Sequence, residues 1–317
     1  MMLLTTLAGR LGVECRTDAD RWLTGIAHPR VAQSDELSFL PPEIATYTGD
    51  AGALLVAGPC RHPPSTLALE VPDPLFACAR AVDWLPVRFE WSQPPAAQVA
   101  PTIAPDAEVA AGCVLEPGAQ VGSGTAVGAW TRIGRGARIG AHCRIAERVT
   151  IGDGVTLGNR VTIDAGSVVG CDAFVALRGA ATWTSFPAFA SVVVQDDASV
   201  GAHCSIARGV FAHTLIGYRV RMDAQVHIGH DTRIGADTIL AGATTVGGGV
   251  VVGRQCVLGG RVAIADGVEI ADRVTITAMS LVTKSIVESA THWSGGWPAQ
   301  RSSAWWRAIA RWRRRPR

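Results

Sequence analysis

The sequence predicts a mainly β chain built around a parallel β-helix of six-residue repeats, with a small N-terminal α/β domain and a C-terminal helix. Three observations predict it. An aliphatic residue recurs at every sixth position over most of the chain, Gly is abundant (35 of 317 residues), and Tyr (2) and Phe (7) are few. A chain rich in glycine and small aliphatic residues is typical of a tightly wound repeat structure.

The aliphatic residues form two unbroken rows and one shorter run, each with a spacing of six. The rows are Ile103, Val109, Leu115, Val121, Val127, Ile133, Ile139, Ile145, Ile151, Leu157, Ile163 and Val169; then Val194, Val200 and Ile206; then Ile216, Met222, Ile228, Ile234, Leu240, Val246, Val252, Leu258, Ile264, Ile270, Ile276 and Val282. This spacing matches neither a helix nor simple strand alternation. The six-residue spacing predicts triangular coils, each with three sides that consist of a short strand and a turn. About nine such coils are expected, stacked at the roughly 4.8 Å spacing of adjacent strands.

Two breaks interrupt the repeat. The stretch between Val169 and Val194 has no hexapeptide pattern and carries Trp183, Phe186 and Phe189, and a shorter break separates Ile206 from Ile216. Both are predicted to be loops that leave the prism. Loops on a rigid scaffold often carry binding groups, although tolerated insertions would give the same pattern.

The segments before and after the repeat form further parts of the chain. Residues 1–85 are predicted to form a small α/β domain, with short strands at WLTGIAH, ELSFL and ALLVA and a helix at PDPLFACARAVDWL. Residues 86–101 are a Pro-punctuated linker and 102–286 the repeat domain. Residues 287–317 are predicted to form a Gly/Pro turn and a basic amphipathic helix.

Composition and charge argue against several classes of protein. With 48% apolar and 18% charged residues, the chain is not a disordered protein. The eight cysteines are scattered singly, the N-terminus lacks the features of a signal peptide, and no apolar run reaches the length of a membrane span. We expect a cytoplasmic protein. The net charge is only +2, yet the last 17 residues carry seven Arg and no acidic residue.

Four segments resemble the UDP-3-O-acylglucosamine N-acyltransferases of lipid A biosynthesis, over nearly the whole length. They are LTGIAHPRVAQSDELSFL, VAPTIAPDAEV, MDAQVHIGHDTRIG and SGGWPAQ. The resemblance implies a left-handed β-helix, a uridine-binding role for residues 1–85, and a homotrimer with sites between chains. It also implies transfer of a 3-hydroxyacyl chain from acyl carrier protein to the 2-amine of a UDP-3-O-acyl-glucosamine. No cofactor and no metal is expected.

Site residues follow from the same resemblance. His230, in IGHD, matches the catalytic histidine, and an imidazole suits the removal of a proton from the attacking amine. Asp223 also matches and could orient that imidazole. Gly248 falls where the family offers a backbone N–H to the oxyanion, as acyl transfer requires.

The residues expected to contact the acceptor match the family's pattern less closely than the catalytic residues do. Phe39 matches the aromatic residue that stacks on uracil, although a core role is an equal alternative, and Tyr47 is the candidate second aromatic residue. Asp231 replaces the family's Asn after the catalytic histidine, and Gly267 stands where a second histidine is common. Other departures are PPEIATY, Ala207-Arg208-Gly209 and DAFVA, which affect nucleotide and phosphate contacts.

The sequence leaves open which partner the basic tail binds and which reaction the protein catalyses. The Arg-rich helix suits an acidic acyl carrier protein, or the inner-membrane surface; nucleic-acid binding is not expected. Acetyl-CoA could be the donor, with another nucleotide amino sugar as acceptor. Metal-dependent hydration would need three converging histidines, whereas His227 and His230 are three residues apart and lie at different points of one turn. Loss of the second histidine also fits a degenerate paralogue that binds without turnover.

Overall fold

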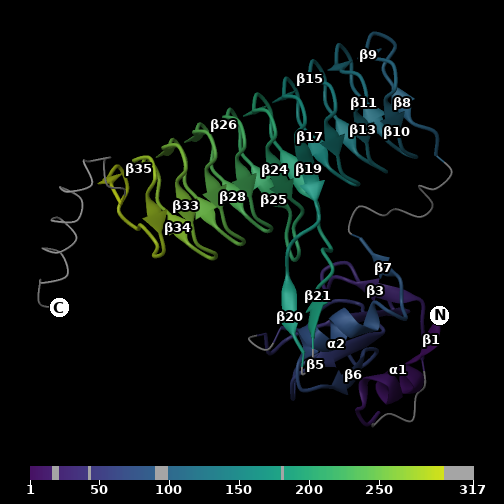
Figure 1. Ribbon diagram of the computed structural model, residues 1–317. Helices are drawn as coiled ribbons and strands as arrows, with labels where there is room; N and C mark the ends of the chain where they lie inside the picture. The colour runs from purple at the N-terminus through teal and green to yellow at the C-terminus, as the bar shows by residue number, and fades with distance from the viewer. Residues whose placement is uncertain (16–20, 42–43, 90–98, 180–181, 296–317) are drawn as a thin grey trace, which may run out of the picture.

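A computed structural model describes the chain except for residues 16–20, 42–43, 90–98, 180–181 and 296–317. A long prism of stacked coils stands over a small N-terminal domain, and two strands run from the middle of the prism down to that domain (Figure 1). The predicted C-terminal helix lies outside the described residues. Neither helix in the described part of the chain has the length and hydropathy of a membrane-spanning segment.

Three parallel sheets form the faces of the prism, and the chain visits them in turn, in the left-handed β-helix fold. The β10–β36 sheet contains β10 (Val114–Leu115), β13 (Arg132–Ile133), β16 (Thr150–Ile151), β19 (Val168–Cys171), β24 (Ser205–Ala207), β27 (His227–Ile228), β30 (Thr245–Val246), β33 (Ala263–Ile264) and β36 (Leu281–Val282). The β8–β34 sheet contains β8 (Thr102–Ile103), β11 (Gln120–Val121), β14 (Arg138–Ile139), β17 (Thr156–Leu157), β22 (Val192–Val194), β25 (Thr214–Ile216), β28 (Arg233–Ile234), β31 (Val251–Val252) and β34 (Glu269–Ile270). The β9–β37 sheet contains β9 (Glu108–Val109), β12 (Ala126–Val127), β15 (Arg144–Ile145), β18 (Thr162–Ile163), β23 (Ser199–Val200), β26 (Arg221–Met222), β29 (Ile239–Leu240), β32 (Val257–Leu258), β35 (Thr275–Ile276) and β37 (His292–Trp293).

The predicted aliphatic rows form the core of this prism. Every member from Val121 to Val282 is buried, whereas Ile103 in the first coil is 44% exposed because no coil covers it from outside. Burying one such side chain contributes roughly 1.5–3 kcal/mol. Sheets of nine, nine and ten strands confirm the prediction of about nine coils.

Glycine after the aliphatic residue allows the coils to approach one another. A Cβ on Gly122 would lie 2.6 Å from the carbonyl oxygen of Gly140 in the next coil. The positive φ angles of the corners fall elsewhere, often on larger residues such as His142 (φ 56°) and Arg160 (φ 56°). Coil stacking, more than backbone freedom, therefore requires glycine at this position.

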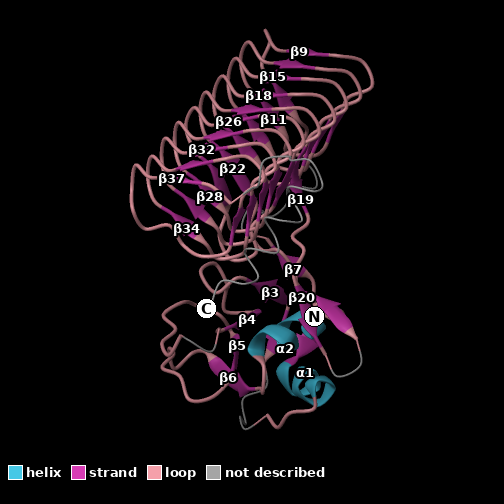
Figure 2. Cartoon of the chain, turned by 60° about the vertical axis from the view of Figure 1, so that its left-hand side comes forward, coloured by secondary structure: helices cyan, strands magenta, loops and turns pink. Residues whose placement is uncertain are grey.

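The N-terminal domain has a five-stranded parallel sheet and both described helices, which Figure 2 shows in cyan. The strand order is β6 (Leu67–Glu70), β5 (Ala53–Val56), β4 (Glu36–Phe39), β3 (Gly25–Ala27) and β7 (Val87–Arg88). The helices are α1 (Leu4–Leu11) and α2 (Pro74–Ala81), and β1 (Met2–Leu3) pairs with β2 (Trp22–Leu23). The sheet's last strand, β7, lies inside the predicted linker.

Helix α2 shows why the local sequence folds as expected. The side chain of Asp73 accepts a hydrogen bond from the backbone N–H of Phe76, and Pro74 occupies the first turn, where a missing N–H costs nothing. Buried Ala77, Cys78 and Ala81 face the sheet. The helix predicted within PDPLFACARAVDWL is thus confirmed.

Both breaks in the repeat leave the prism at the same corner, between the β10–β36 and β8–β34 sheets. The first forms a hairpin of β20 (Ala176–Arg178) and β21 (Trp183–Ser185), which reaches the N-terminal domain (Figure 1). Phe186, Phe189 and Val210 from the two loops are buried in the core of the N-terminal domain. The loops therefore fasten that domain to the prism.

Candidate functional site

The corner that carries both loops, here called the loop-bearing corner, also carries the predicted base. Strand register aligns Ser205 with His227 and Ile206 with Ile228, so Arg208 and His230 occupy the same corner position in successive coils. The next two coils place Gly248 and Asp266 at that position. The column is therefore Arg208, His230, Gly248 and Asp266.

The imidazole of His230 contacts the side chain of its neighbour in the chain. Its Nδ1 lies 2.9 Å from Oδ2 of Asp231, and the two side chains are 26% and 14% exposed. When the Asp231 carboxylate accepts a hydrogen bond from Nδ1–H, the imidazole carries its free lone pair on Nε2, which is the tautomer that a general base needs. The geometry thus defines a histidine–aspartate pair.

Asp231 is itself fixed by the second loop. Its Oδ1 accepts hydrogen bonds from the backbone N–H groups of Val210, Phe211 and Ala212, at 2.9, 2.9 and 2.8 Å. Its backbone is left-handed, with φ 57°, a conformation that Asp tolerates better than most residues. One carboxylate therefore orients the imidazole and ties the loop to the prism.

Gly248 lies directly against the imidazole of His230. A Cβ at Gly248 would come within 2.5 Å of Nε2, so only glycine leaves room for the ring. The Gly248 N–H, predicted to serve an oxyanion, donates to Oδ1 of Asp266 at 2.8 Å. The same bond between successive coils recurs at Arg254 and Asp272, at the neighbouring corner.

Asp223 lies at a different corner from His230, between the β9–β37 and β10–β36 sheets. It is exposed, and its carboxylate accepts hydrogen bonds from the backbone N–H groups of Ala224 (2.7 Å) and Gly242 (3.0 Å). The contact to His230 that was predicted for Asp223 is instead made by Asp231. An orienting role for Asp223 stays a prediction.

Phe39 lies in the core at the junction of domain and prism. Its ring is fully buried, with centroids 5.5 Å from Phe186 and 5.5 Å from Phe189. A uracil could stack on it only if one of these rings moved, so the stacking role stays a prediction.

Tyr47 is also buried and belongs to a different apolar cluster. Its hydroxyl donates to the carbonyl of Pro29 and accepts from the N–H of Ala51. Burial raises the pKa of Tyr47. The structure does not bring the Phe39 and Tyr47 rings together, and the substrate contact proposed for Tyr47 is likewise untested.

His227, in the strand before His230, lies on the outer face of the β10–β36 sheet. Its Nδ1 is 2.7 Å from the hydroxyl oxygen of Ser205, and burial lowers its pKa. Among the described residues, no group of three or more His, Cys, Asp or Glu side chains is placed to hold a metal ion. Gly267 has φ 69°, and the space beside its Cβ position is open.

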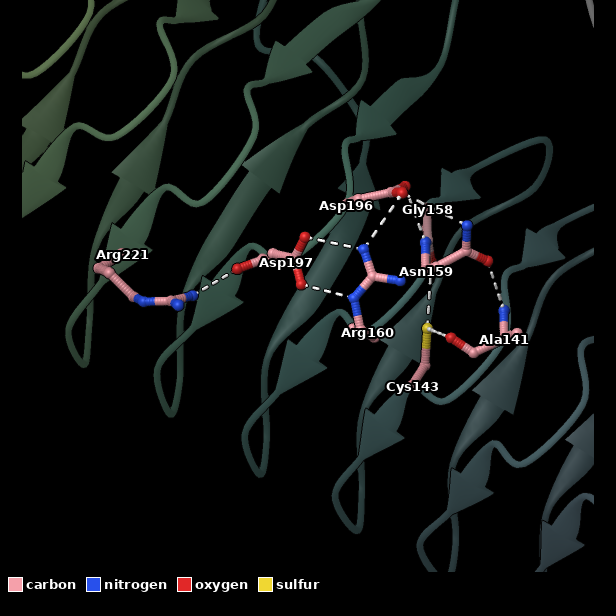
Figure 3. Close-up of polar contacts among 8 residues, drawn as sticks. All are labelled: Ala141, Cys143, Gly158, Asn159, Arg160, Asp196, Asp197 and Arg221. Atoms are coloured by element: carbon pink, nitrogen blue, oxygen red, sulfur yellow. Dashed lines mark hydrogen bonds and ion pairs between the residues drawn. The ribbon is translucent and has the colours of Figure 1, made fainter.

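The corner between the β8–β34 and β9–β37 sheets is also polar, but its side chains pair among themselves (Figure 3). Arg160 makes two bonds to the carboxylate of Asp197, at 2.7 and 2.9 Å, and Arg221 donates to the Asp197 carbonyl. Oδ1 of Asn159 accepts from the N–H of Ala141 in the preceding coil. These bonds link successive coils, so this corner has a structural role.

Comparison with known proteins places the chain among acyl-transferring enzymes. Residues 136–171 match the family described as bacterial transferase hexapeptide (six repeats). The chain is 35% identical to the UDP-3-O-acylglucosamine N-acyltransferase of Pseudomonas syringae pv. tomato, over 98% of this chain and 90% of the relative. It is 38% identical to the enzyme of the same name from Pseudomonas fluorescens, over 97% and 89%.

Solved structures agree on the fold. A crystal structure of a UDP-N-acetylglucosamine acyltransferase superposes with a TM-score of 0.50 at 24% identity, covering 62% of this chain and 71% of that one. At this identity the likeness concerns the β-helix alone.

Proposed function

This chain belongs to the family of UDP-3-O-acylglucosamine N-acyltransferases, and from that premise we propose that His230 is the general base of its acyl transfer. The proposed reaction moves a 3-hydroxyacyl chain from acyl carrier protein to the 2-amine of a UDP-3-O-acyl-glucosamine. The amine nitrogen attacks the thioester carbonyl carbon, a C–N bond forms, and the C–S bond breaks. His230 takes the amine proton and returns it to the leaving thiolate.

The His230–Asp231 pair at the loop-bearing corner carries this proposal. Asp231 receives three backbone N–H bonds on Oδ1, so its Oδ2 stays in place for Nδ1 of His230. An imidazole held in one tautomer and one orientation is a more effective base than a freely rotating one. Gly248 leaves Nε2 the space that it needs.

The developing oxyanion needs a hydrogen-bond donor. In the proposed reaction the Gly248 N–H supplies it, exchanging Asp266 Oδ1 for the oxyanion. The exchange has a cost, since a charge-assisted bond is given up. Gly248 is therefore proposed both to make room for the base and to donate to the intermediate.

The partners belong to the same proposal: acyl carrier protein as donor, a UDP-linked amino sugar as acceptor, and two further copies of the chain. Residues 296–317 hold the seven Arg and are proposed to meet the acidic carrier protein. Contact of this tail with the inner-membrane surface is the alternative.

The test is a donor and acceptor comparison with purified protein. 3-Hydroxyacyl–acyl carrier protein and acetyl-CoA are each incubated with UDP-3-O-acyl-glucosamine, and products are identified by mass spectrometry. We expect the diacylated sugar with the carrier-protein donor and at least about a hundredfold less product with acetyl-CoA. Preference for acetyl-CoA would overturn the donor assignment. Binding of the acceptor without product would indicate a degenerate paralogue.

A further inference from the structure

The turn at residues 209–212, in the second loop, has the partner of the base on one side and the N-terminal domain on the other. Its three backbone N–H groups from Val210 to Ala212 all donate to Oδ1 of Asp231. The side chain of Val210 is fully buried in the core of the N-terminal domain. The turn therefore lies between that domain and the histidine–aspartate pair.

The ring of Phe211 extends from this turn into the aromatic cluster at the junction. Its centroid lies 6.1 Å from that of Phe39, on strand β4 of the N-terminal domain, and 6.5 Å from that of His28 in the same domain. The Phe186 ring, from the first loop, is 5.6 Å away. These separations lie in the range of about 4.5–7 Å that aromatic pairs prefer. The N-terminal domain therefore contacts Phe211 through its side chain.

The turn is compact, so its parts are expected to move together. A Cβ on Gly209 would collide with the carbonyl oxygen of Ala212, which shows how closely the chain folds back on itself. The Val210 carbonyl accepts a hydrogen bond from the N–H of Phe189, at 3.2 Å, so the turn is also tied to the first loop. A displaced Phe211 ring would thus shift all three donors to the carboxylate.

The Asp231 carboxylate is the contact between the turn and the base. Its Oδ1 accepts from the turn, and its Oδ2 lies 2.9 Å from Nδ1 of His230. The two oxygens belong to one planar group, so a rotation that follows the turn at Oδ1 would move Oδ2 away from the imidazole. Without an acceptor at Nδ1, the neutral imidazole would populate both tautomers, and only one of them leaves the lone pair on Nε2.

We propose that Phe211 is a positioning residue for the general base. Its ring anchors the 209–212 turn on the N-terminal domain, and the turn keeps Asp231 in the orientation that holds His230 with its proton on Nδ1. Outer contacts of this kind fix the tautomer and orientation of functional histidines. The N-terminal domain then contributes to the chemical step through Phe211, although it lies outside the prism that carries the base. The inference rests on the proposed function for the role of His230.

The first measurement reads the tautomer of His230 without any substrate. In the full-length protein with nitrogen-15-labelled histidines, NMR reports the protonation of each ring nitrogen, and the His230 signals are assigned by their absence in His230→Gln. The neutral ring of the wild type should carry its proton on Nδ1. Phe211→Ala should show both tautomers, whereas Phe211→Leu, which retains a large apolar side chain, should keep the wild-type pattern.

Tyr218→Ala is the matched control. The Tyr218 ring is 46% exposed, comparable with 37% for Phe211. It lies at the corner between the β8–β34 and β9–β37 sheets, away from the junction. The variant loses an aromatic ring of similar exposure and should leave the His230 signals and kcat unchanged.

Turnover gives a second measurement. At saturating concentrations of both substrates, kcat of Phe211→Ala should fall about tenfold, and kcat of Phe211→Leu should stay within about threefold of wild type. Asp231→Ala removes the contact through which Phe211 acts. In that background, Phe211→Ala should therefore change kcat by less than about twofold.

Two results would overturn the inference: His230 signals that stay unchanged in Phe211→Ala, or losses in kcat that multiply in the double variant. If Phe211→Ala does not fold, Phe211→Val takes its place, with the same expected and the same contrary results. The proposed function fails separately. A wild type that shows the coupled tautomer but forms no diacylated sugar refutes that function alone. Turnover that depends on His230 but not on Phe211 refutes the inference alone.

Discussion

Nδ1 of His230 lies 2.9 Å from Oδ2 of Asp231, the next residue in the chain. The other oxygen of the same carboxylate accepts three backbone N–H bonds from the loop at 210–212. The base and the loop that meets the N-terminal domain therefore share one anchor. The Asp231 side chain thus links that loop directly to the imidazole.

Replacing Asp231 by Asn should slow the reaction more than the same change at Asp223. An Asn that keeps its oxygen on the three N–H groups turns its NH₂ toward Nδ1 of His230 and favours the tautomer with the proton on Nε2. We expect kcat to fall by about 10–100-fold with little change in the KM for the acceptor. Asp223→Asn should stay within about twofold of wild type. A larger loss at Asp223 would show that the residue seven positions earlier orients the base.

Gly248→Ala should displace the imidazole. The new methyl group would lie within 2.5 Å of Nε2, so the ring must rotate away from its partner. Misplacement of a reacting group by about 1 Å can cost on the order of a hundredfold in rate, which is the expected fall in kcat. Gly267→Asn is the matched control, because its Cβ enters open space and Asn tolerates a positive φ. Full activity of Gly248→Ala would contradict the described contact.

Phe189→Ala should loosen the N-terminal domain from the prism. Phe189 is fully buried against Phe39 and Phe186 at the junction. Truncation of such a side chain costs about 3–5 kcal/mol. Urea unfolding followed by Trp fluorescence should show a lower midpoint, while Phe174→Ala, at a residue that is 91% exposed, should change stability by less than about 0.5 kcal/mol. Equal effects of the two variants would argue against the fastening role of the loops.

His227 should make the fold less stable in acid. Burial lowers the pKa of His227 below the ordinary histidine value of about 6.5, so the folded state binds fewer protons than the unfolded state in this range. Stability is therefore present above about pH 6.5 and is lost as the pH falls through the lower folded pKa. Wild type should lose more stability than His227→Gln between about pH 7.5 and 5. Parallel losses in thermal melts would show that another group is responsible.

The prism could be predicted because the residues that build its core recur at a fixed, short spacing along the chain. A single inward residue per six, repeated without a miss, specifies both the coil and its core, and every row member from Val121 onward is buried. The same logic shows why Asp223 does not reach His230. Residues seven apart fall on neighbouring corners, since each side of the coil takes six residues.

The site could be predicted only in part, because inserted loops change the 18-residue spacing between positions at the same corner of successive coils. Residues 18 apart share a corner, which correctly relates His230 to Gly248. Arg208 is 22 residues before His230, because the second loop adds four, and its place in the column appears only in the strand register. The loop bonds to Asp231 are tertiary contacts without a local signal. Phe186 and Phe189 were recognisable as available for packing, but their partner was not.

The most direct test of the central claim is the single-turnover rate of His230→Gln with 3-hydroxyacyl–acyl carrier protein and UDP-3-O-acyl-glucosamine, at saturating concentrations of both. The general-base role predicts a loss of at least about a hundredfold in rate. The melting temperature and the affinity for UDP should remain near those of wild type. A rate within about threefold of wild type would contradict the assignment of His230 as the base.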